Sequence, residues 1–195
     1  MKRIFLTILI SNFTFIVFSQ ENNEEKDKIE WIAFEEAIEA NSKEQKKFFI
    51  DVYTDWCGWC KRMDATTFKD EKIIKLLNEN YHTVKLDAEM KDTVRLGNDT
   101  FVNEKPNQKR HPHQLAIALL NGKLSYPSVV FLDEKGNMIQ PLAGYQKAEN
   151  LAPILNFFAD NEHLKEDANF EEYLKNIKYK CNQLTINLFY LNIIS

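Results

Sequence analysis

The sequence lacks any block of basic residues and has only three cysteines among its 195 residues. Lysine and arginine are scattered among acidic residues and the net charge is −4, so neither a nucleic-acid partner nor a membrane surface is indicated. Cys57 and Cys60 form one Cys-X-X-Cys motif, and no second motif of this kind follows. A structural zinc site needs more ligands than this pair supplies.

The sequence also lacks a long uninterrupted hydrophobic run. Residues 4–18 are apolar but are diluted by polar residues, among them Ser11, Asn12 and Thr14, whereas a membrane anchor needs roughly 18 or more strongly apolar residues. A basic start precedes the run and the small residues Val17 and Ser19 end it, which predicts a signal peptide over residues 1–19 and Gln20 as the first mature residue. Retention of this segment as an anchor is the alternative. No cysteine immediately follows the run, which argues against a lipid-anchored lipoprotein.

What is present is a globular composition, with 44% apolar and 12% aromatic residues. Residues 20–28 are all polar or charged and are predicted to be a solvated linker. Residues 29–160 carry the apolar patterns of a single domain. Residues 161–195 form a C-terminal extension with one helix-like stretch, and the sequence assigns this extension no role.

Within the domain, apolar periodicity predicts alternating strands and helices. Helices are expected over roughly 33–42, 57–80 (with a break near 66–67), 115–120 and 148–159, and strands over 47–54, 83–89, 127–133 and 138–144. A short first strand near Ile29–Ile32 gives the order βαβαβαββα, a mixed sheet with helices on both faces. Residues 97–112 are predicted to be a long loop, and Pro153 is expected in the first turn of its helix.

The Cys-X-X-Cys motif follows a predicted strand and opens a predicted helix. Free amide groups and the helix dipole at that point favour the thiolate of Cys57. Cys60 lies one helical turn further on, close enough to form a disulfide and expected to be more buried. Disulfide exchange requires an exposed thiol of low pKa that attacks, beside a thiol that resolves the mixed disulfide. The position therefore indicates a redox pair.

Two acidic residues are candidates for moving protons at this pair. Asp64 lies four residues after Cys60 and seven after Cys57, so helical spacing places all three on one face. Asp51 lies on the buried strand, where a charge is costly unless the carboxyl takes up a proton. It is therefore a candidate proton acceptor for Cys60. The alternatives are a satisfied structural carboxylate for Asp51 and an ordinary exposed charge for Asp64.

Other potential metal ligands are few. His111 and His113 could join the two cysteines in binding zinc or copper, but a loop with Pro112 at the first turn of the next helix explains the segment without a metal. We therefore expect no metal site. Cys181 leaves an odd cysteine, either free or paired between chains.

Over residues 29–160 the chain resembles the thioredoxin superfamily. The stretch WCGWCK at 56–61 is similar to the family's WCxxCK, and Tyr126-Pro127 stands where the family has a cis-proline before a strand. Asp51 matches the family's buried acid, and Lys85 matches the lysine that accompanies it.

A closer resemblance is to the C-terminal periplasmic domain of the DsbD family. DVYTDWCGWCK at 51–61, followed by TF at 67–68, is similar to that domain, which also has an acid at the position of Asp64. The resemblance implies a thioredoxin-like α/β fold with a mixed central sheet.

Four residues are expected to contact a partner protein. Trp56 and Trp59 flank the cysteines. Core packing is the alternative, but aromatic residues beside a thiol suit the docking of an apolar segment. The resemblance implies a cis bond before Pro127, which would turn the backbone of Tyr126 toward Cys57 and let a substrate strand pair with it.

The sequence therefore predicts a thiol–disulfide oxidoreductase of the cell envelope, periplasmic or secreted. It favours the role of reductant over that of oxidant. Its expected partners are protein disulfide substrates and an upstream protein that donates or accepts electrons. It is expected to be monomeric, with no cofactor beyond the Cys57–Cys60 disulfide. A non-catalytic metal-binding or chaperone module, using the Cys-X-X-Cys motif and the His111–His113 loop, is the alternative.

The first testable prediction concerns the roles of the two thiols. Because only Cys57 lies at the start of the helix, we expect it to attack and Cys60 to resolve. Cys60→Ser should trap mixed disulfides with partner proteins, and Cys57→Ser should trap none, as read by non-reducing electrophoresis. Faster alkylation of Cys60 than of Cys57 in the reduced protein would contradict this assignment.

Overall fold

The computed structural model describes residues 28–177. The predicted signal peptide, all but the last residue of the linker, and Cys181 lie outside this range. The helices are α1 (Phe34–Lys43), α2 (Gly58–Ala65), α3 (Glu71–Asn80), α4 (Gln114–Leu119) and α5 (Ala148–Ala159), with short 3-10 turns η1 (Thr67–Lys69) and η2 (Glu162–Leu164). The strands are β1 (Lys47–Tyr53), β2 (Tyr81–Asp87), β3 (Val94–Leu96), β4 (Asp99–Phe101), β5 (Ser128–Leu132) and β6 (Met138–Ala143).

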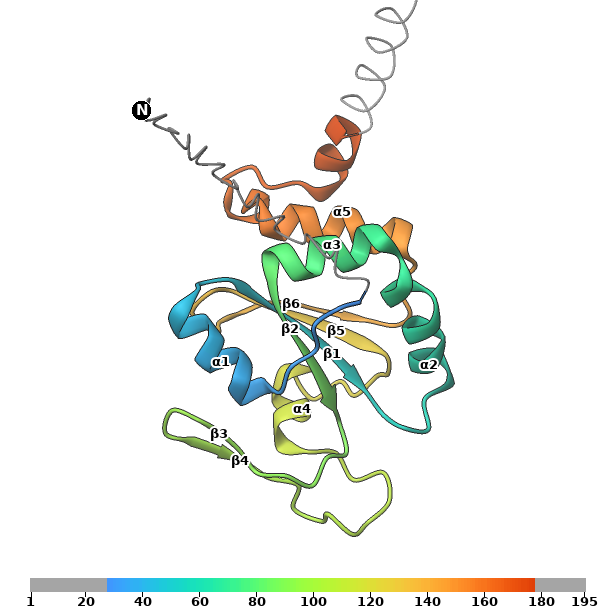
Figure 1. Ribbon diagram of the computed structural model, residues 1–195, viewed down its shortest axis with the longest axis vertical. Helices are drawn as coiled ribbons and strands as arrows, with labels where there is room; N and C mark the ends of the chain where they lie inside the picture. Colours follow the sequence, from blue (N-terminus) through green and yellow to red (C-terminus); the bar gives the residue numbers. More distant parts are fainter. Residues whose placement is uncertain (1–27, 178–195) are drawn as a thin grey trace, which may run out of the picture.

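The central sheet is mixed and has the order β2-β1-β5-β6 (Figure 1). β1 and β2 are parallel, and the pairs β1–β5 and β5–β6 are antiparallel. The predicted α/β class and the helices on both faces are therefore confirmed. β1 lies in the interior of the sheet, so the segment that follows it starts from a fixed position.

Both faces of the sheet are buried, which explains why β1 reads as an apolar run. Phe49 faces a core made with α2, α3 and α5, in which Met63, Ile73 and Leu155 are fully buried. Alternate β1 residues face a second core made with α1 and α4. Its members from β1, α1 and α4 are Phe48, Ile50, Val52, Phe34, Ala37, Leu115, Ala116 and Leu119. Because strand side chains alternate in direction, Asp51 shares the face of Phe49.

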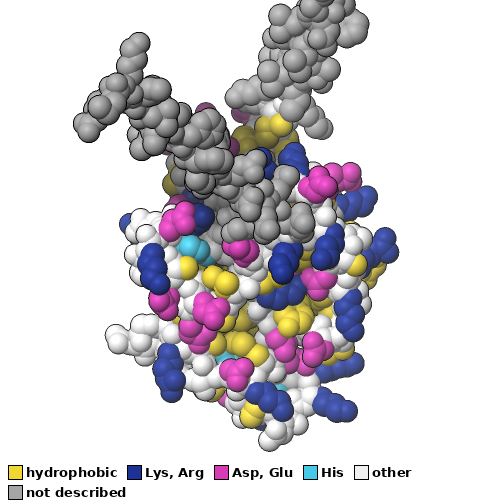
Figure 2. Space-filling view, in the orientation of Figure 1, with side chains coloured by type: hydrophobic (Ala, Val, Ile, Leu, Met, Phe, Trp, Pro, Cys, Tyr) yellow, Lys and Arg dark blue, Asp and Glu magenta, His cyan; other side chains and the backbone are white. Residues whose placement is uncertain are grey.

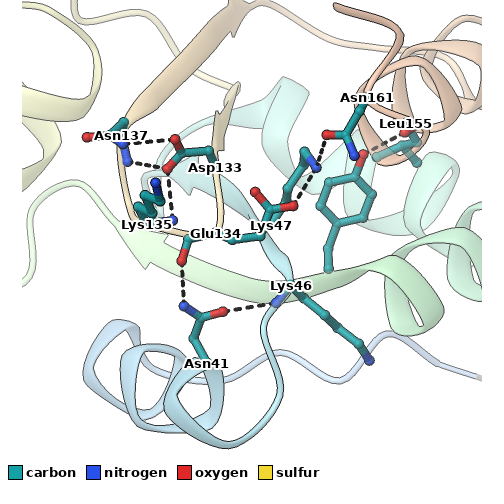
Figure 3. A network of polar contacts seen from close by, with 10 residues as sticks. Asn41, Lys46, Lys47, Asp133, Glu134, Lys135, Asn137, Leu155 and Asn161 are labelled. Carbon is teal, nitrogen blue, oxygen red and sulfur yellow. Dashed lines mark hydrogen bonds and ion pairs between the residues drawn. The ribbon is translucent and has the colours of Figure 1, made fainter. Parts of the chain in front are cut away.

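The far end of the sheet is fixed by the buried Lys47 (Figure 3). Its ammonium group binds Glu134 at 2.6 Å and donates to the side chain of Asn161 at 2.7 Å. The side chain of Asn41 donates to the carbonyl of Glu134 at 2.7 Å. These bonds join the start of β1 to the β5–β6 turn and to the end of α5. Lys47 thus ties down the end of β1 that lies away from the cysteines.

Three expectations about the elements are wrong. The predicted strand at Ile29–Ile32 is a single bridge between Ile32 and Val84. The predicted loop over 97–112 contains β4, which pairs with β3 in a small hairpin whose residues are mostly exposed, so it carries no apolar alternation to detect. Pro153 lies inside α5 rather than in its first turn. Its neighbours in the helix are buried in the core, and this packing offsets the lost hydrogen bond.

The C-terminal extension packs on the domain where it is described. Residues 170–177 are helical, as the sequence predicts. Phe170 and Tyr173 contact the ring of Phe157 on α5, with ring centroids 5.2 and 5.1 Å away. Figure 1 shows this segment beyond α5, on the opposite side from α4. No helix within residues 28–177 combines the length and apolar character needed to cross a bilayer. On the face drawn in Figure 2, charged side chains of both signs are distributed over the surface.

Candidate active site

Cys57 lies where β1 gives way to α2. The backbone N–H of Cys57 donates to the carbonyl of Thr54 at 3.1 Å, closing a tight turn. Cys57 is the N-cap of α2, and its sulfur accepts the backbone N–H of Cys60 at 3.0 Å. The two cysteines form a disulfide with a Cα–Cα distance of 5.3 Å. The predicted position at a strand-to-helix junction is confirmed.

Both cysteines are buried in this oxidised form. Cys60 is 3% exposed, and Cys57 is only 5% exposed. The expectation of an exposed Cys57 is therefore wrong for the disulfide form. A partner must reach the sulfur of Cys57 through a small opening, so the residues around that opening matter.

Asp51 and Lys85 face each other across the parallel pair β1–β2. The ammonium group of Lys85 lies 2.6 Å from Oδ2 of Asp51 and also binds Oδ1 of Asp64 on α2. The side chain of Asp51 is 2% exposed, against 43% for Asp64. Oδ1 of Asp51 is buried and has no hydrogen-bond partner among residues 28–177. The three charges thus run from the buried sheet toward the surface.

Burial dominates the electrostatics of this triad. It raises the pKa of Asp51 to about 6, although the ion pair with Lys85 pulls the other way. Burial alone would lower the pKa of Lys85, but its two carboxylate partners outweigh it and raise the pKa. Asp51 can therefore take up or release a proton near neutral pH, while Lys85 stays charged.

Aromatic rings enclose the ammonium group of Lys85. It lies over Tyr53 at 5.0 Å and over Trp31 and Phe68 at 5.2 Å. Such cation–π contacts stabilise a partly desolvated ammonium ion. Asp64, for which an ordinary exposed charge was the alternative, is an ion-pair partner of Lys85. This link between α2 and β2 could not be read from spacing along one helix.

Trp56 and Trp59 are half-exposed, at 49% and 58%. Core packing, the alternative for both, is therefore excluded. The ring of Trp59 lies 5.5 Å from that of Tyr145 and 5.5 Å from the guanidinium of Arg62. It forms an aromatic surface on the α2 side of the disulfide.

Trp56 is held by three residues from distant parts of the chain. Its indole N–H donates to Glu89 at 2.7 Å, the guanidinium of Arg110 lies 4.8 Å from its ring centroid, and the ring of Tyr126 meets its edge at 6.0 Å. The bond between Tyr126 and Pro127 is cis, as the resemblance implied. Sequence reasoning missed Glu89 and Arg110, because nothing in their local pattern marks them.

The two histidines considered as metal ligands have other partners. The Nδ1 atom of His113 accepts the backbone N–H of Leu115, and its Nε2 atom contacts the carbonyl of Asp92 at 2.9 Å. His113, not Pro112, starts the turn of α4, as its N-cap. The Nδ1 atom of His111 contacts the side chain of Asn103 at 2.9 Å. Within residues 28–177, no three His, Cys, Asp or Glu side chains are grouped to hold a metal ion.

Comparisons with known proteins point to one family. The family model of the thioredoxin-like domain matches residues 34–159. Spermatogenesis-associated protein 20 of Mus musculus is 36% identical over 75 residues, 38% of this chain and 10% of that protein. The thiol:disulfide interchange protein DsbD of Photorhabdus laumondii is 27% identical over 122 residues, 63% of this chain and 16% of that protein. The disulfide bond reductase DsbH of Chlamydia pneumoniae is 24% identical over 114 residues, 57% of this chain and 60% of that protein.

A solved structure supports the fold. A thioredoxin-fold protein from Helicobacter pylori superposes with a TM-score of 0.55 at 19% identity, covering 83% of this chain and 96% of that chain. The family model and the DsbD relative confirm the predicted resemblance to thioredoxins and to the DsbD domain. The chain spans about a tenth of the length of the mammalian relatives that it matches.

The raised pKa of Asp51 predicts a pH-dependent cost to stability. Because the carboxyl has a pKa of about 6 in the folded protein against an ordinary 3.8, its favourable contribution is present below about pH 4 and is lost as the pH rises through about 6. Asp51→Asn should therefore gain stability relative to wild type between about pH 4 and about pH 7.5, by up to about 3 kcal/mol. Urea unfolding of the oxidised proteins at both pH values measures this difference.

The exposed Asp99 on β4 provides a matched control. Asp99→Asn makes the same isosteric change and should show no such dependence on pH. A stability difference between wild type and Asp51→Asn that is the same at both pH values would contradict the raised pKa.

Proposed function

The chain belongs to the thioredoxin-like domain family, and from this premise we propose that it is a thiol–disulfide oxidoreductase that acts on partner proteins through Cys57 and Cys60. One observation carries the proposal. A disulfide at the N-cap of a helix follows a strand that holds a buried carboxyl with a pKa of about 6. A purely structural disulfide needs no proton acceptor of this kind.

The exchange begins with the reduced protein. The thiolate of Cys57, stabilised by the free amide groups at the start of α2, attacks one sulfur of a partner's disulfide. The partner's sulfur–sulfur bond breaks, a mixed disulfide with Cys57 forms, and the partner's other sulfur leaves as a thiolate. The reduction of the partner is not yet complete at this stage, because one of its sulfurs is still bonded to Cys57.

The second step releases the partner. Cys60 loses its proton, for which Asp51 is the acceptor, and its thiolate attacks the sulfur of Cys57. The Cys57–Cys60 disulfide forms, the mixed disulfide breaks, and the partner leaves with two thiols. Oδ1 of Asp51, which has no hydrogen-bond partner among the described residues, is the atom available to take this proton. A donor protein of the same chemistry must then reduce the pair again.

Electrostatics favour the reductant direction. Carboxylates near the thiols oppose thiolate formation, which makes the reduced form less stable relative to the disulfide and the protein more reducing. Asp51 and Asp64 are such groups, partly neutralised by Lys85. The name of the Chlamydia relative, a disulfide bond reductase, agrees with this direction.

Partner binding is assigned to the surface around the disulfide. The two half-exposed tryptophans lie on either side of Cys57, and Tyr126 contacts Trp56. In the proposed complex the partner's disulfide segment lies along Tyr126 and Pro127 as an added strand, between the aromatic rings. No cofactor other than the disulfide is required. The metal-chaperone alternative has no observation in its favour within residues 28–177. There, the side chains of His111 and His113 form hydrogen bonds to other residues of the protein.

The decisive experiment compares wild type with Asp51→Asn. The reduced wild-type protein should reduce a model protein disulfide such as that of insulin. Asp51→Asn should keep the fold and slow resolution of the mixed disulfide by about 10²–10⁴-fold, the usual contribution of a general base. Stopped-flow tryptophan fluorescence at neutral pH measures the rate, and Asp99→Asn again serves as the control. Equal rates in wild type and Asp51→Asn would remove Asp51 from the mechanism.

The proposed location in the cell envelope rests on the sequence of residues 1–19. Cleavage there would give a mature protein that begins near Gln20 and lies outside the cytoplasm, where disulfide exchange is sustained. Mass spectrometry of the protein from its native host, after cell fractionation, tests this prediction. An intact Met1 terminus in the soluble cytoplasmic fraction would contradict it.

A further inference from the structure

The segment between β2 and α4, which we call the 88–113 loop, is closed at its two ends. The backbone N–H of His113 donates to the carbonyl of Ala88 at 2.7 Å. The N–H of Ala88 in turn donates to the carbonyl of Tyr53, the last residue of β1, at 2.8 Å. The whole loop therefore begins and ends beside the strand that leads to Cys57. Although the loop is long, both of its ends are thus close to the segment that carries the disulfide.

The interior of the loop is held by hydrogen bonds from side chains that take no part in the proposed disulfide exchange. Asn103, 7% exposed, donates to the carbonyl of His111 at 2.9 Å and to the carbonyls of Glu89 and Met90 at 3.4 and 3.3 Å. The ring of His111 contacts the same asparagine, and the fully buried ring of His113 contacts the carbonyl of Asp92. Asn103 thus cross-links the start of the loop, at Glu89 and Met90, to its end, at His111. Such satisfied polar networks hold a single conformation.

This fixed loop places two side chains on Trp56. Glu89, at its start, accepts the indole N–H, and Arg110, near its end, stacks on the ring. Arg110 adopts a left-handed backbone with φ of 61°, which a non-glycine residue adopts only where its surroundings require it. Within residues 28–177, no carboxylate lies within ion-pair distance of Arg110. Its described contact is therefore with Trp56, and Trp56 is the residue before Cys57.

Holding Trp56 has a consequence for substrate choice. A small disulfide needs only the opening to the sulfur of Cys57, whereas a protein segment must also pack against what surrounds it. A ring already fixed by a hydrogen bond and a stacked guanidinium loses less conformational freedom on binding than a mobile one. The benefit therefore applies to partners large enough to cover Trp56.

We propose that Arg110 and Glu89 are positioning residues through which the 88–113 loop selects protein disulfides over small-molecule disulfides, by holding Trp56 as a fixed docking surface. This inference rests on the proposed oxidoreductase function and deepens it. Trp59 lies on the other side of the disulfide, where Arg62 of its own helix stacks on its ring. Its described ring contacts, with Arg62 and Tyr145, include no residue of the 88–113 loop.

The test measures selectivity. The values of kcat and KM are determined for insulin and for glutathione disulfide, with wild type and with Arg110→Ala. Arg110→Ala should raise KM for insulin about 2- to 5-fold, the equivalent of one exposed cation–π contact, with little change in kcat. The ratio of kcat/KM for insulin to that for glutathione disulfide should fall by the same factor. Lys109→Ala, which removes a positive charge from the neighbouring exposed position, is the matched control and should keep the wild-type ratio.

Two further measurements separate positioning from charge and from loss of structure. Arg110→Lys keeps the charge but not the planar stack, so it should recover less than half of the lost selectivity. The indole N–H of Trp56, followed by NMR, should exchange with solvent several-fold faster in Arg110→Ala and in Glu89→Ala, and Glu89→Gln should restore slow exchange because its amide oxygen still accepts. This readout does not depend on activity.

The outcomes are distinguishable. If wild type reduces both disulfides and Arg110→Ala keeps the wild-type selectivity ratio, the inference is wrong and the proposed function stands. Full recovery by Arg110→Lys would also overturn it, because charge alone would then act. If wild type reduces neither disulfide, the proposed function fails and the inference fails with it.

Discussion

The ion pair between Lys85 and Asp51 is the interaction on which the rest of the candidate site depends. It is set by the register of two parallel strands, because Asp51 and Lys85 are direct partners in the β1–β2 pair. A shift of one residue would move every β2 side chain to the other face and leave a buried carboxylate without a cation, which is strongly destabilising. The apolar side chains that fill both faces of the sheet exclude that shift. The hydrophobic core therefore fixes the electrostatics of the disulfide as well as the fold.

The same lysine links the buried carboxyl of Asp51 to a carboxylate at the surface. Its second partner, Asp64, lies one helical turn after Cys60 on α2, and three aromatic rings enclose the ammonium group. Two carboxyls sharing one cation are in different environments, one buried and one half-exposed. Burial raises the pKa of Asp51 to about 6, which suits a group that must accept a proton at neutral pH and give it back. A lysine in contact with both acids keeps that shift moderate.

The relatives that this chain matches are mostly much longer than the chain itself. This chain spans about a tenth of the mammalian relatives and 16% of a bacterial DsbD, so the similarity is confined to one segment of each of those longer chains. The features that distinguish this chain are therefore best sought in its own loops. The 88–113 loop is the largest of these in the described part of the domain, and both of its ends are hydrogen-bonded beside the strand that leads to the cysteines.

The sequence by itself determined whatever depends on neighbours along the chain. It placed Cys57 at a strand-to-helix junction, Cys60 and Asp64 on successive turns of one helix, Asp51 on a buried strand, and α5 over residues 148–159, because helical and strand periodicity are local properties. Resemblance added the cis bond before Pro127. Only the tertiary structure decided the rest. The contact of Lys85 with Asp64 and the placing of Glu89 and Arg110 on Trp56 join residues 21 to 54 positions apart, and contacts at such separations leave no periodic trace in the sequence. The β3–β4 hairpin is local, but its mostly exposed residues give it no apolar alternation to detect.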